Sequence, residues 1–413
     1  MKDLLILGGG TAGTVVANGA RRLLDDTWRV TVVDPRETHL YQPGLLFLPF
    51  GETDATDLVH ARADTFDDGI TWVAREVDRV VPESQRVHLV GGDSLPYDLL
   101  IVASGAEVHP EMTPGLTGPG WQASAFEFYT LTGAVALQGA LARFERGRFV
   151  VNVVETPIKC PVAPLEMLFL ADEYFTKRGI RSQVELVYAT PLDAAFTKPI
   201  AAAALGELLK QKDIHLETDF ATAEVDGETR VLKSYDDRTV PYDLLVSIPI
   251  HGGAAFVERS GLGDESAYVH ADPRTLRAKG HERIFVLGDA GAYPTSKAGS
   301  VAHFQAESFL ANLPHILKNE EPAPLFDGHA NCFVETGHGK ALLIDFNYDV
   351  EPLPGSYPVP GIGPFSLLAE SRRNHWGKLA FKWIYWNGLL PNRPMPVPMQ
   401  MSMAGKHVPV VHP

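Results

Sequence analysis

The first 34 residues contain the pattern that most restricts how this chain can fold. The run DLLILGGGTAGTVVANGARRLL predicts a strand, a tight turn and a helix, with Gly8, Gly10 and Gly13 at the spacing G-x-G-x-x-G. The first glycine permits the turn, the second lets a pyrophosphate approach the backbone, and the third lets the helix pack on the strand. Asp34 ends the next predicted strand, where a carboxylate accepts hydrogen bonds from ribose hydroxyls. The pattern predicts a nucleotide site, and the alternative is a tight turn without a ligand.

Two later stretches indicate which nucleotide binds. Residues 97–107 predict a strand that ends in Ala103-Ser104-Gly105, and residues 284–313 predict a strand that ends in Gly288-Asp289 before a loop and a helix. These stretches resemble the A-T-G and G-D signatures of two-dinucleotide-fold flavoproteins, with serine in place of the usual threonine. The alternative for Asp289 is a helix-cap or turn aspartate. The resemblance implies FAD bound by Gly8, Gly10, Thr11, Ala12, Gly13, Asp34, Ser104, Gly105, Gly288 and Asp289.

A second βαβ pattern lies between those two signatures. The runs RFVVNVV and QVELVYA predict strands, and APLEMLFLADEYFTKRG and PIAAAALGELLKQKD predict helices. The turn after RFVVNVV should hold a second glycine-rich loop for NAD(P)H, but residues 155–164 read ETPIKCPVAP and contain no glycine. Side chains and proline rings would fill the space that a pyrophosphate needs. We therefore expect NAD(P)H binding here to be lost or badly weakened, with Cys160 in its place.

Composition limits the remaining possibilities. A chain of 413 residues is long enough for two domains and an extra segment, and its net charge of −15 argues against nucleic-acid binding. We expect an α/β fold with two Rossmann-like domains. The FAD-binding domain would comprise residues 1–110 and 270–320, the second Rossmann-like domain residues 111–269, and a C-terminal segment residues 321–413. The N-terminus enters a strand directly, which predicts no signal peptide, and no apolar run is long enough to span a bilayer.

Several motifs resemble the sulfide:quinone oxidoreductase family and its relatives, the flavoprotein subunits of flavocytochrome c sulfide dehydrogenase. They are PIKCPVAPLE around Cys160, NCFVETGHGKALLIDFNY around Cys332, YQPGLLFLPFG at 41–51 and PTSKAGSVAHFQ at 294–305. The resemblance covers nearly the whole chain. It implies that Cys160 and Cys332 face each other beside the flavin and form a redox-active disulfide or a polysulfide bridge. The alternative for each cysteine is a buried, inert small side chain.

Further residues are candidates for roles in such a site. Because Cys160 sits between a strand and a helix, we expect the helix dipole to lower the pKa of its thiol. Glu166, on the following helix, can accept the proton of hydrosulfide, or it is a glutamate stabilised by the dipole. Lys297 can stabilise a reduced flavin anion as a cofactor-binding and catalytic residue, or it is a surface lysine. His303 and His338 are weaker candidates for proton transfer.

The cofactor and metal content can also be predicted. The usual third cysteine of the family and the flavin-linking cysteine are both missing, so we expect non-covalent FAD. No cluster of residues has metal-ligand spacing, so we expect no metal.

The C-terminal 43 residues differ from the rest of the chain, because residues 371–413 contain no Asp or Glu. This segment holds six basic residues: Arg372, Arg373, Lys378, Lys382, Arg393 and Lys406. The run SRRNHWGKLAFKWIYWNGLLP has apolar residues near helical period, which is typical of a helix in a membrane interface. The alternative is a helix that packs on the domain or on a dimer partner. Membrane contact would give access to quinone, with Phe346, Tyr348 or an aromatic side chain from Phe381 to Trp386 in the pocket.

The leading hypothesis is a peripheral membrane flavoenzyme that oxidises sulfide and reduces membrane quinone. A soluble flavoprotein that donates electrons to a cytochrome, a type II NADH:quinone dehydrogenase and a thiol redox sensor are the alternatives. Whether the chain forms a homo-oligomer is left open by the sequence.

Overall fold

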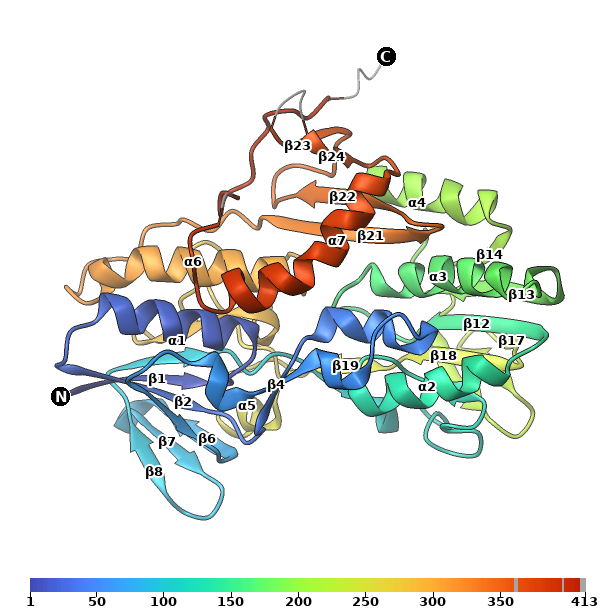
Figure 1. The fold of residues 1–413 in the computed structure, drawn as a ribbon. Helices are drawn as coiled ribbons and strands as arrows, with labels where there is room; N and C mark the ends of the chain where they lie inside the picture. Colours follow the sequence, from blue (N-terminus) through green and yellow to red (C-terminus); the bar gives the residue numbers. More distant parts are fainter. Residues whose placement is uncertain (360–362, 396, 409–413) are drawn as a thin grey trace.

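The computed structural model describes residues 1–359, 363–395 and 397–408 (Figure 1). Its first layer is a parallel sheet of five strands in the order β20-β9-β1-β2-β5. These strands are β20 (Ile284–Val286), β9 (Leu99–Val102), β1 (Lys2–Leu7), β2 (Trp28–Val33) and β5 (Ile70–Val73). Helices α1 (Thr11–Leu23) and α6 (Gly299–Ile316) pack against each other over this sheet (Figure 1). Three stretches distant in sequence, residues 2–34, 99–105 and 284–290, thus meet at one sheet, as the two glycine signatures predicted.

A second parallel sheet repeats this arrangement, in the order β11-β18-β12-β13-β14. It comprises β11 (Ala125–Phe126), β18 (Leu244–Ile248), β12 (Gly147–Val153), β13 (Val184–Ala189) and β14 (Ile214–Glu217). Helices α2 (Leu131–Arg143), α3 (Ala163–Lys177) and α4 (Pro199–Gln211) accompany it. The central strands are apolar and buried because helices cover such parallel sheets. The predicted strand-helix-strand unit around Cys160 is therefore β12-α3-β13.

The C-terminal part forms a third layer. A four-stranded sheet in the order β21-β22-β24-β23 consists of β21 (Ala330–Gly337), β22 (Lys340–Phe346), β24 (Gly363–Leu367) and β23 (Gly355–Val359). Helix α3 lies between this layer and the second sheet, because it contacts β21 on one side and β12 and β13 on the other (Figure 1). Helix α7 (Arg372–Ile384) crosses β21, β22 and β24 and continues as a π-helical turn, Tyr385–Leu389.

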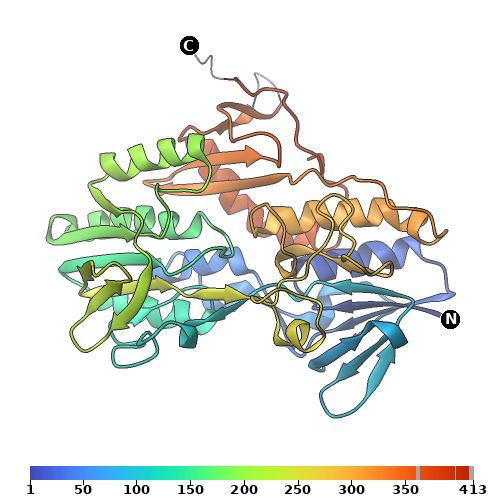
Figure 2. The same cartoon turned by 180° about the vertical axis from the view of Figure 1, so that it is seen from behind.

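Four small antiparallel sheets complete the described part of the molecule. Two have two strands each, β3-β4 (Thr38–Leu40, Val59–Ala61) and β10-β19 (Glu107–His109, Ile250–Gly252). Two have three strands each, β6-β7-β8 (Val77–Val81, Arg86–Leu89, Ser94–Pro96) and β15-β16-β17 (Thr222–Asp226, Val231–Ser234, Thr239–Pro241). Both three-stranded sheets lie on the side of the molecule opposite the C-terminal sheet (Figure 2). The expected mixed α/β class is confirmed. None of the helices in the described ranges is long and apolar enough to cross a bilayer.

Candidate active site

The glycine loop after β1 has the shape that a dinucleotide requires. Gly8 has a φ of +103°, and a Cβ there would collide with the carbonyl of Ala103, so the turn depends on glycine. A Cβ on Gly10 would meet nothing within 4 Å, which leaves this side of the loop open to a phosphate. The buried carboxylate of Asp34 accepts a hydrogen bond from the backbone N–H of Gly9 at 2.8 Å. The loop and the acid lie together, and they fit a bound FAD.

The two other predicted FAD segments border the same loop. Ser104 follows β9, and its buried Oγ has no hydrogen-bond partner among the described residues. Gly288 donates its N–H to Gln305 Oε1 at 2.6 Å, which fixes the Gly288-Asp289 turn to α6. Burial raises the pKa of Asp289, whereas the charges of Lys297 and Lys159 oppose that rise. A half-buried acid and an unpartnered hydroxyl beside the glycine loop also fit a polar cofactor.

Lys297 is buried and does not lie on the surface. Its Nζ donates to the carbonyl oxygens of Asp289 at 2.8 Å and Gly291 at 3.0 Å, and it lies 3.6 Å from the centre of the Tyr268 ring. Burial lowers the pKa of Lys297 to about 8, and the carboxylate of Asp289 opposes this shift. The alternative of a surface lysine is therefore wrong.

The loop that carries Cys160 is bonded directly to the Lys297 segment. The N–H of Cys160 donates to the carbonyl of Lys297 at 2.6 Å, and the Cys160 carbonyl accepts from Ala163 N at 2.9 Å and Tyr129 OH at 3.3 Å. The backbone of Cys160 has a φ of +47°, a left-handed conformation that costs an L-residue about 1 kcal/mol. Strain at a single non-glycine residue is frequent at functional sites. These contacts hold Cys160 between the second sheet and the predicted flavin segments.

Cys332 reaches the same place from the C-terminal sheet. It lies on β21, opposite Ile344 of β22, and β21 packs against both α3 and α6. Both cysteines are free thiols, and the charges of the same two side chains, Glu166 and Lys378, act on each of them. Two half-buried thiols, 172 residues apart in sequence, are thus brought close to the same pair of charges.

The environment of these thiols differs from the one that the sequence indicated. Burial raises the pKa of Cys160 far above its usual value, and the Glu166 carboxylate and the Cys332 thiol raise it further. Burial also raises the pKa of Cys332 to about 12, and Glu166 adds to that shift. The N–H of Ala163, in the first turn of α3, does lower the pKa of Cys160, as the helix start predicted, but the net shift is upward. Desolvation and a neighbouring carboxylate outweigh the first turn of one helix.

The pair of Glu166 and Lys378 lies at the centre of the site. Glu166 of α3 is 1% exposed, and its Oε1 is bonded to Lys378 Nζ and accepts the N–H of Glu335 at 2.7 Å. Lys378 of α7 also donates to the Phe333 carbonyl at 3.0 Å. The positive charge of Lys378 lowers the pKa of both thiols and so opposes the effect of burial. The interpretation of Lys378 as a surface charge on an interfacial helix is wrong.

Sequence reasoning missed several other side chains in this region. Tyr129 holds the Cys160 loop, and the ring of His251 lies 5.0 Å from it, edge to face. Glu335 of β21 is buried beside His375 of α7, with 2.9 Å between Oε2 and Nδ1. Glu335 lies three residues after Cys332 on the quoted β21 motif, whereas Tyr129 and His251 have no motif around them.

The weaker candidates are placed as follows. His303 is buried in α6, 3.4 Å from Glu307, and His338 lies in the β21–β22 turn, 3.1 Å from Asp172 of α3.

Phe346 is buried at the end of β22, and Tyr348 donates its hydroxyl hydrogen to the Pro273 carbonyl. The predicted aromatic segment contacts the glycine loop: the Tyr385 hydroxyl lies 2.8 Å from Thr11 Oγ1 and 2.7 Å from His39 Nε2.

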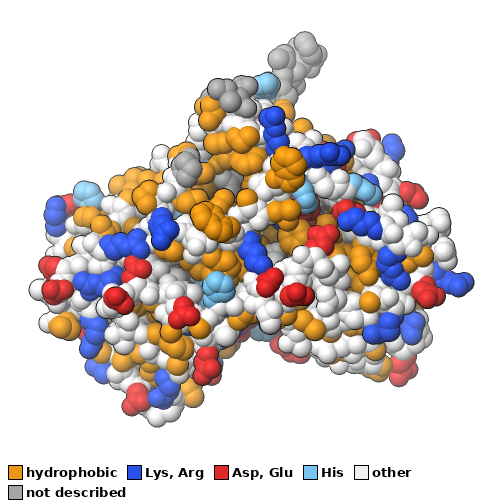
Figure 3. Space-filling model, viewed as in Figure 1, with side chains coloured by type: hydrophobic (Ala, Val, Ile, Leu, Met, Phe, Trp, Pro, Cys, Tyr) orange, Lys and Arg blue, Asp and Glu red, His pale blue; other side chains and the backbone are white. Residues whose placement is uncertain are grey.

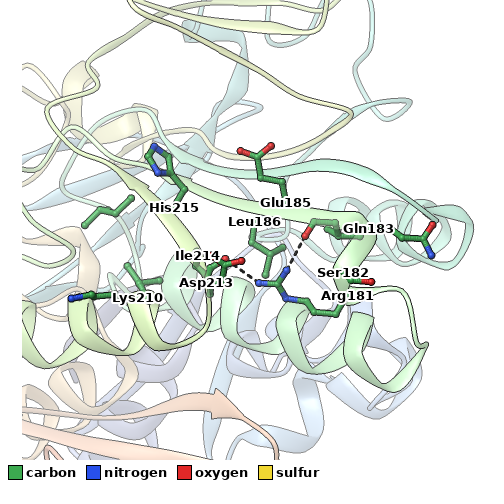
Figure 4. A pocket seen from close by; sticks show the side chains of 13 residues that line it. Arg181, Ser182, Gln183, Glu185, Leu186, Lys210, Asp213, Ile214 and His215 are labelled. Atoms are coloured by element: carbon green, nitrogen blue, oxygen red, sulfur yellow. Dashed lines mark hydrogen bonds between the residues drawn. The ribbon is translucent and has the colours of Figure 1, made fainter.

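Two cavities lie outside this cluster. A polar groove of about 690 Å³ follows the outer edge of the second sheet, where Arg181 donates to the carbonyls of Val184 and Asp213 (Figure 4). A smaller cavity of about 220 Å³ lies at the carboxyl ends of β12 and β13, where Glu155 lines it. That is the usual position of a dinucleotide in a Rossmann unit, but a carboxylate there repels phosphates. Among the described residues, no group of three or more His, Cys, Asp or Glu side chains is placed to hold a metal ion.

Comparisons with known proteins agree with this geometry. The family model described as pyridine nucleotide-disulphide oxidoreductase matches residues 2–151. The mitochondrial sulfide:quinone oxidoreductase of Mus musculus is 27% identical over 398 residues, which cover 92% of this chain and 88% of that protein. The alternative NAD(P)H-ubiquinone oxidoreductase C1 of Arabidopsis thaliana is 26% identical over 324 residues, 70% of this chain and 61% of that protein. The solved sulfide:quinone oxidoreductase of Aquifex aeolicus superposes with a TM-score of 0.80 at 18% identity, over 94% of this chain and 92% of that one.

The fold and these matches support one class: the protein is an enzyme, with the fold of the pyridine nucleotide-disulphide oxidoreductases. Within that class the chain resembles sulfide:quinone oxidoreductases over more than nine-tenths of its length. The resemblance inferred from the motifs around Cys160 and Cys332 is therefore confirmed.

Proposed function

We propose that this enzyme oxidises sulfide with Cys160 and Cys332 and passes two electrons through non-covalently bound FAD to a membrane quinone. The convergence of two distant thiols on the Glu166–Lys378 pair supports this proposal most directly. The names of the homologues support sulfide oxidation with electron transfer to quinone.

Thiol–disulfide exchange accounts for the use of two cysteines. Hydrosulfide attacks one sulfur of a Cys160–Cys332 disulfide, the S–S bond breaks, and a persulfide and a thiolate form. The persulfide then loses its proton to a base, for which we propose Glu166, whose buried Oε2 has no hydrogen-bond partner among the described residues. When bound, FAD supplies the acceptor for the electron pair that leaves the sulfur atoms. Lys378 stabilises the thiolate, since its charge lowers the pKa of both thiols.

An anaerobic titration of the flavoprotein tests this function. Sulfide should bleach the flavin absorbance at about 450 nm within seconds, and a short-chain quinone should restore it. NADH should leave the absorbance unchanged, because residues 155–164 lack the glycines of a dinucleotide loop. Bleaching by NADH but not by sulfide would overturn the proposal in favour of an NADH:quinone dehydrogenase. Rapid reoxidation by a cytochrome alone would favour a soluble sulfide dehydrogenase, and slow reoxidation by every acceptor would favour a thiol sensor.

We also propose that α7 places the enzyme on a membrane surface. The side chains of Trp376, Leu379 and Trp383 are 64%, 50% and 69% exposed and recur at helical spacing. Apolar side chains gather over α7 in the space-filling view (Figure 3). The face with Lys378 and Phe381 packs on the protein, so the packing alternative explains one face of α7 but not the exposed one.

The C-terminal segment exposes fewer basic side chains than the sequence indicated. The side chains of Lys378 and Lys406 are only 13% and 1% exposed, and they form ion pairs with Glu166 and Asp345 respectively. Arg372, Arg373 and Arg393 are exposed, and Lys382 is partly exposed, 3.7 Å from Asp57. Trp386 stacks on His60 at 3.8 Å and so belongs to the packed side. The proposed membrane contact therefore depends mainly on the apolar face.

Replacing Trp376, Leu379 and Trp383 together by serine should release the enzyme from vesicles of phosphatidylcholine and phosphatidylglycerol. Burial of each apolar side chain in lipid contributes about 1.5–3 kcal/mol to the free energy of binding. Without all three, the affinity for the vesicles should fall at least about 100-fold. Cosedimentation with the vesicles measures this. Tyr235→Ser removes an aromatic side chain that is 77% exposed elsewhere and serves as the matched control. Equal loss of binding in both variants would contradict a role for this face.

A further inference from the structure

A row of ionisable side chains connects the thiol site with α7 and the surface. Its first member is Glu166, whose Oε2 is unpartnered beside the two thiols. Lys378 is bonded to the other oxygen, Oε1, and Glu335 lies next to this pair through its own N–H bond to Glu166. Glu335 is bonded in turn to His375, whose side chain is 20% exposed. Two helices and one strand therefore supply four groups in sequence from a buried site toward solvent.

We propose that Glu166, Lys378, Glu335 and His375 form a proton path that carries the proton released at the thiol site to the surface. This inference rests on the proposed function, because sulfide oxidation produces that proton. Hydrosulfide carries one proton, and the sulfane sulfur that it becomes carries none. Glu166, the first acceptor, is 1% exposed, so a proton that it takes needs further acceptors to reach solvent.

The transfer can be written without any net change in the four groups. The persulfide S–H gives its proton to Glu166 Oε2, which weakens the ion pair between Glu166 and Lys378. The freed ammonium of Lys378 gives a proton to the Glu335 carboxylate, and the neutral amine then takes the proton of Glu166. Glu335 passes its proton to His375, which releases it to water. Among the described residues no ion pair joins Lys378 to Glu335, so this step requires the lysine side chain to move.

Of the four groups in the path, Glu335 is the one whose pKa is placed near neutral pH. Burial raises its pKa to about 7, and the Glu166 carboxylate of α3 adds to that rise. Lys378 and His375, both of α7, oppose the rise with their positive charges. His375 also faces Glu52, whose pKa is raised by burial. A carboxyl group with such a pKa both accepts and releases a proton near neutral pH, which a permanently charged ion pair does not do.

Glu335→Gln tests the path, since glutamine keeps the size of the side chain and an acceptor oxygen but cannot take up or release a proton near neutral pH. With the rate divided by the hydrosulfide concentration at each pH, so that the ionisation of hydrogen sulfide itself is removed, flavin bleaching in the natural protein should still rise with pH across about 7. The variant should lose that inflection and bleach about tenfold more slowly or worse, and added imidazole should restore part of the rate. Glu370→Gln, which removes a surface carboxylate near the start of α7 that lies 3.8 Å from Lys340, is the matched control and should change neither property.

A second variant and a second measurement separate the possible failures. His375→Leu should move the inflection to higher pH, because His375 lowers the pKa of Glu335. Infrared titration of the carboxyl groups, without sulfide, should show a band with a midpoint of about 7 that Glu335→Gln removes. An unchanged inflection and rate in Glu335→Gln, or no such band, would overturn the path. No bleaching of the natural protein by sulfide would overturn the proposed function instead, whatever the infrared titration shows.

Discussion

Replacing Cys160 by serine should abolish the reduction of the bound flavin by sulfide, and replacing Cys332 by serine should do the same. Each variant lacks one of the two sulfurs between which electrons must move, and a serine hydroxyl cannot form a disulfide. We expect the rate of bleaching in stopped-flow experiments to fall at least about 1,000-fold in each variant. The double variant should lose no more than either single one, because two residues that act as one unit are not additive.

The same variants should keep their fold and their flavin. Both thiols pack at the edge of the main apolar core, where an isosteric change to serine costs about 1 kcal/mol. Flavin content and the melting curve therefore check the structure, and dithionite should still bleach the flavin because it needs no thiol. Sulfide-driven bleaching that survives in Cys332→Ser at the natural rate would leave Cys160 as an isolated thiol and remove the basis of the disulfide chemistry.

Those features of the site that depend on local sequence could be predicted. The glycine turn, Asp34, the Gly288-Asp289 turn and the β12-α3 loop each depend on a few neighbouring residues, and the structure places all four beside one another. The helical period of residues 372–384 also predicted α7. In each case the physical requirement, such as an open backbone at Gly10, is visible within one short stretch.

The electrostatics of the site could not be predicted in this way. The pKa of Cys160 depends on how deeply β21 and α3 cover it, which no pattern around the residue indicates. Lys378 occupies a helix whose exposed face carries two tryptophans, so its own burial against α3 is a property of the tertiary packing. Glu335 and His375 belong to different elements, and only the docking of α7 on β21 brings them together.

Lys378→Met should destabilise the protein more than any surface change on α7. Glu166 is 1% exposed, and without Lys378 its carboxylate stays buried with only the N–H of Glu335 as a partner among the described residues. Loss of one member of a buried ion pair costs about 3–5 kcal/mol, because the remaining charge is desolvated without compensation. The free energy of unfolding in urea measures this loss. The double variant Glu166→Gln/Lys378→Met removes both charges and should recover most of the stability.

The loss of unfolding free energy in Lys378→Met should grow as the pH rises. Burial raises the pKa of Glu166 above its usual value of 4.5, and Lys378 opposes that rise, so the pKa is higher still in Lys378→Met. An acid whose pKa is raised on folding destabilises the folded state at high pH. That penalty disappears as the pH falls below the pKa of the unfolded state, because Glu166 is then neutral in both states. The stability gap between Lys378→Met and the double variant should therefore be largest above neutral pH and close toward pH about 4. A gap that stays constant with pH would mean that the loss comes from packing of the lysine stem, and the buried charge of Glu166 would not be its cause.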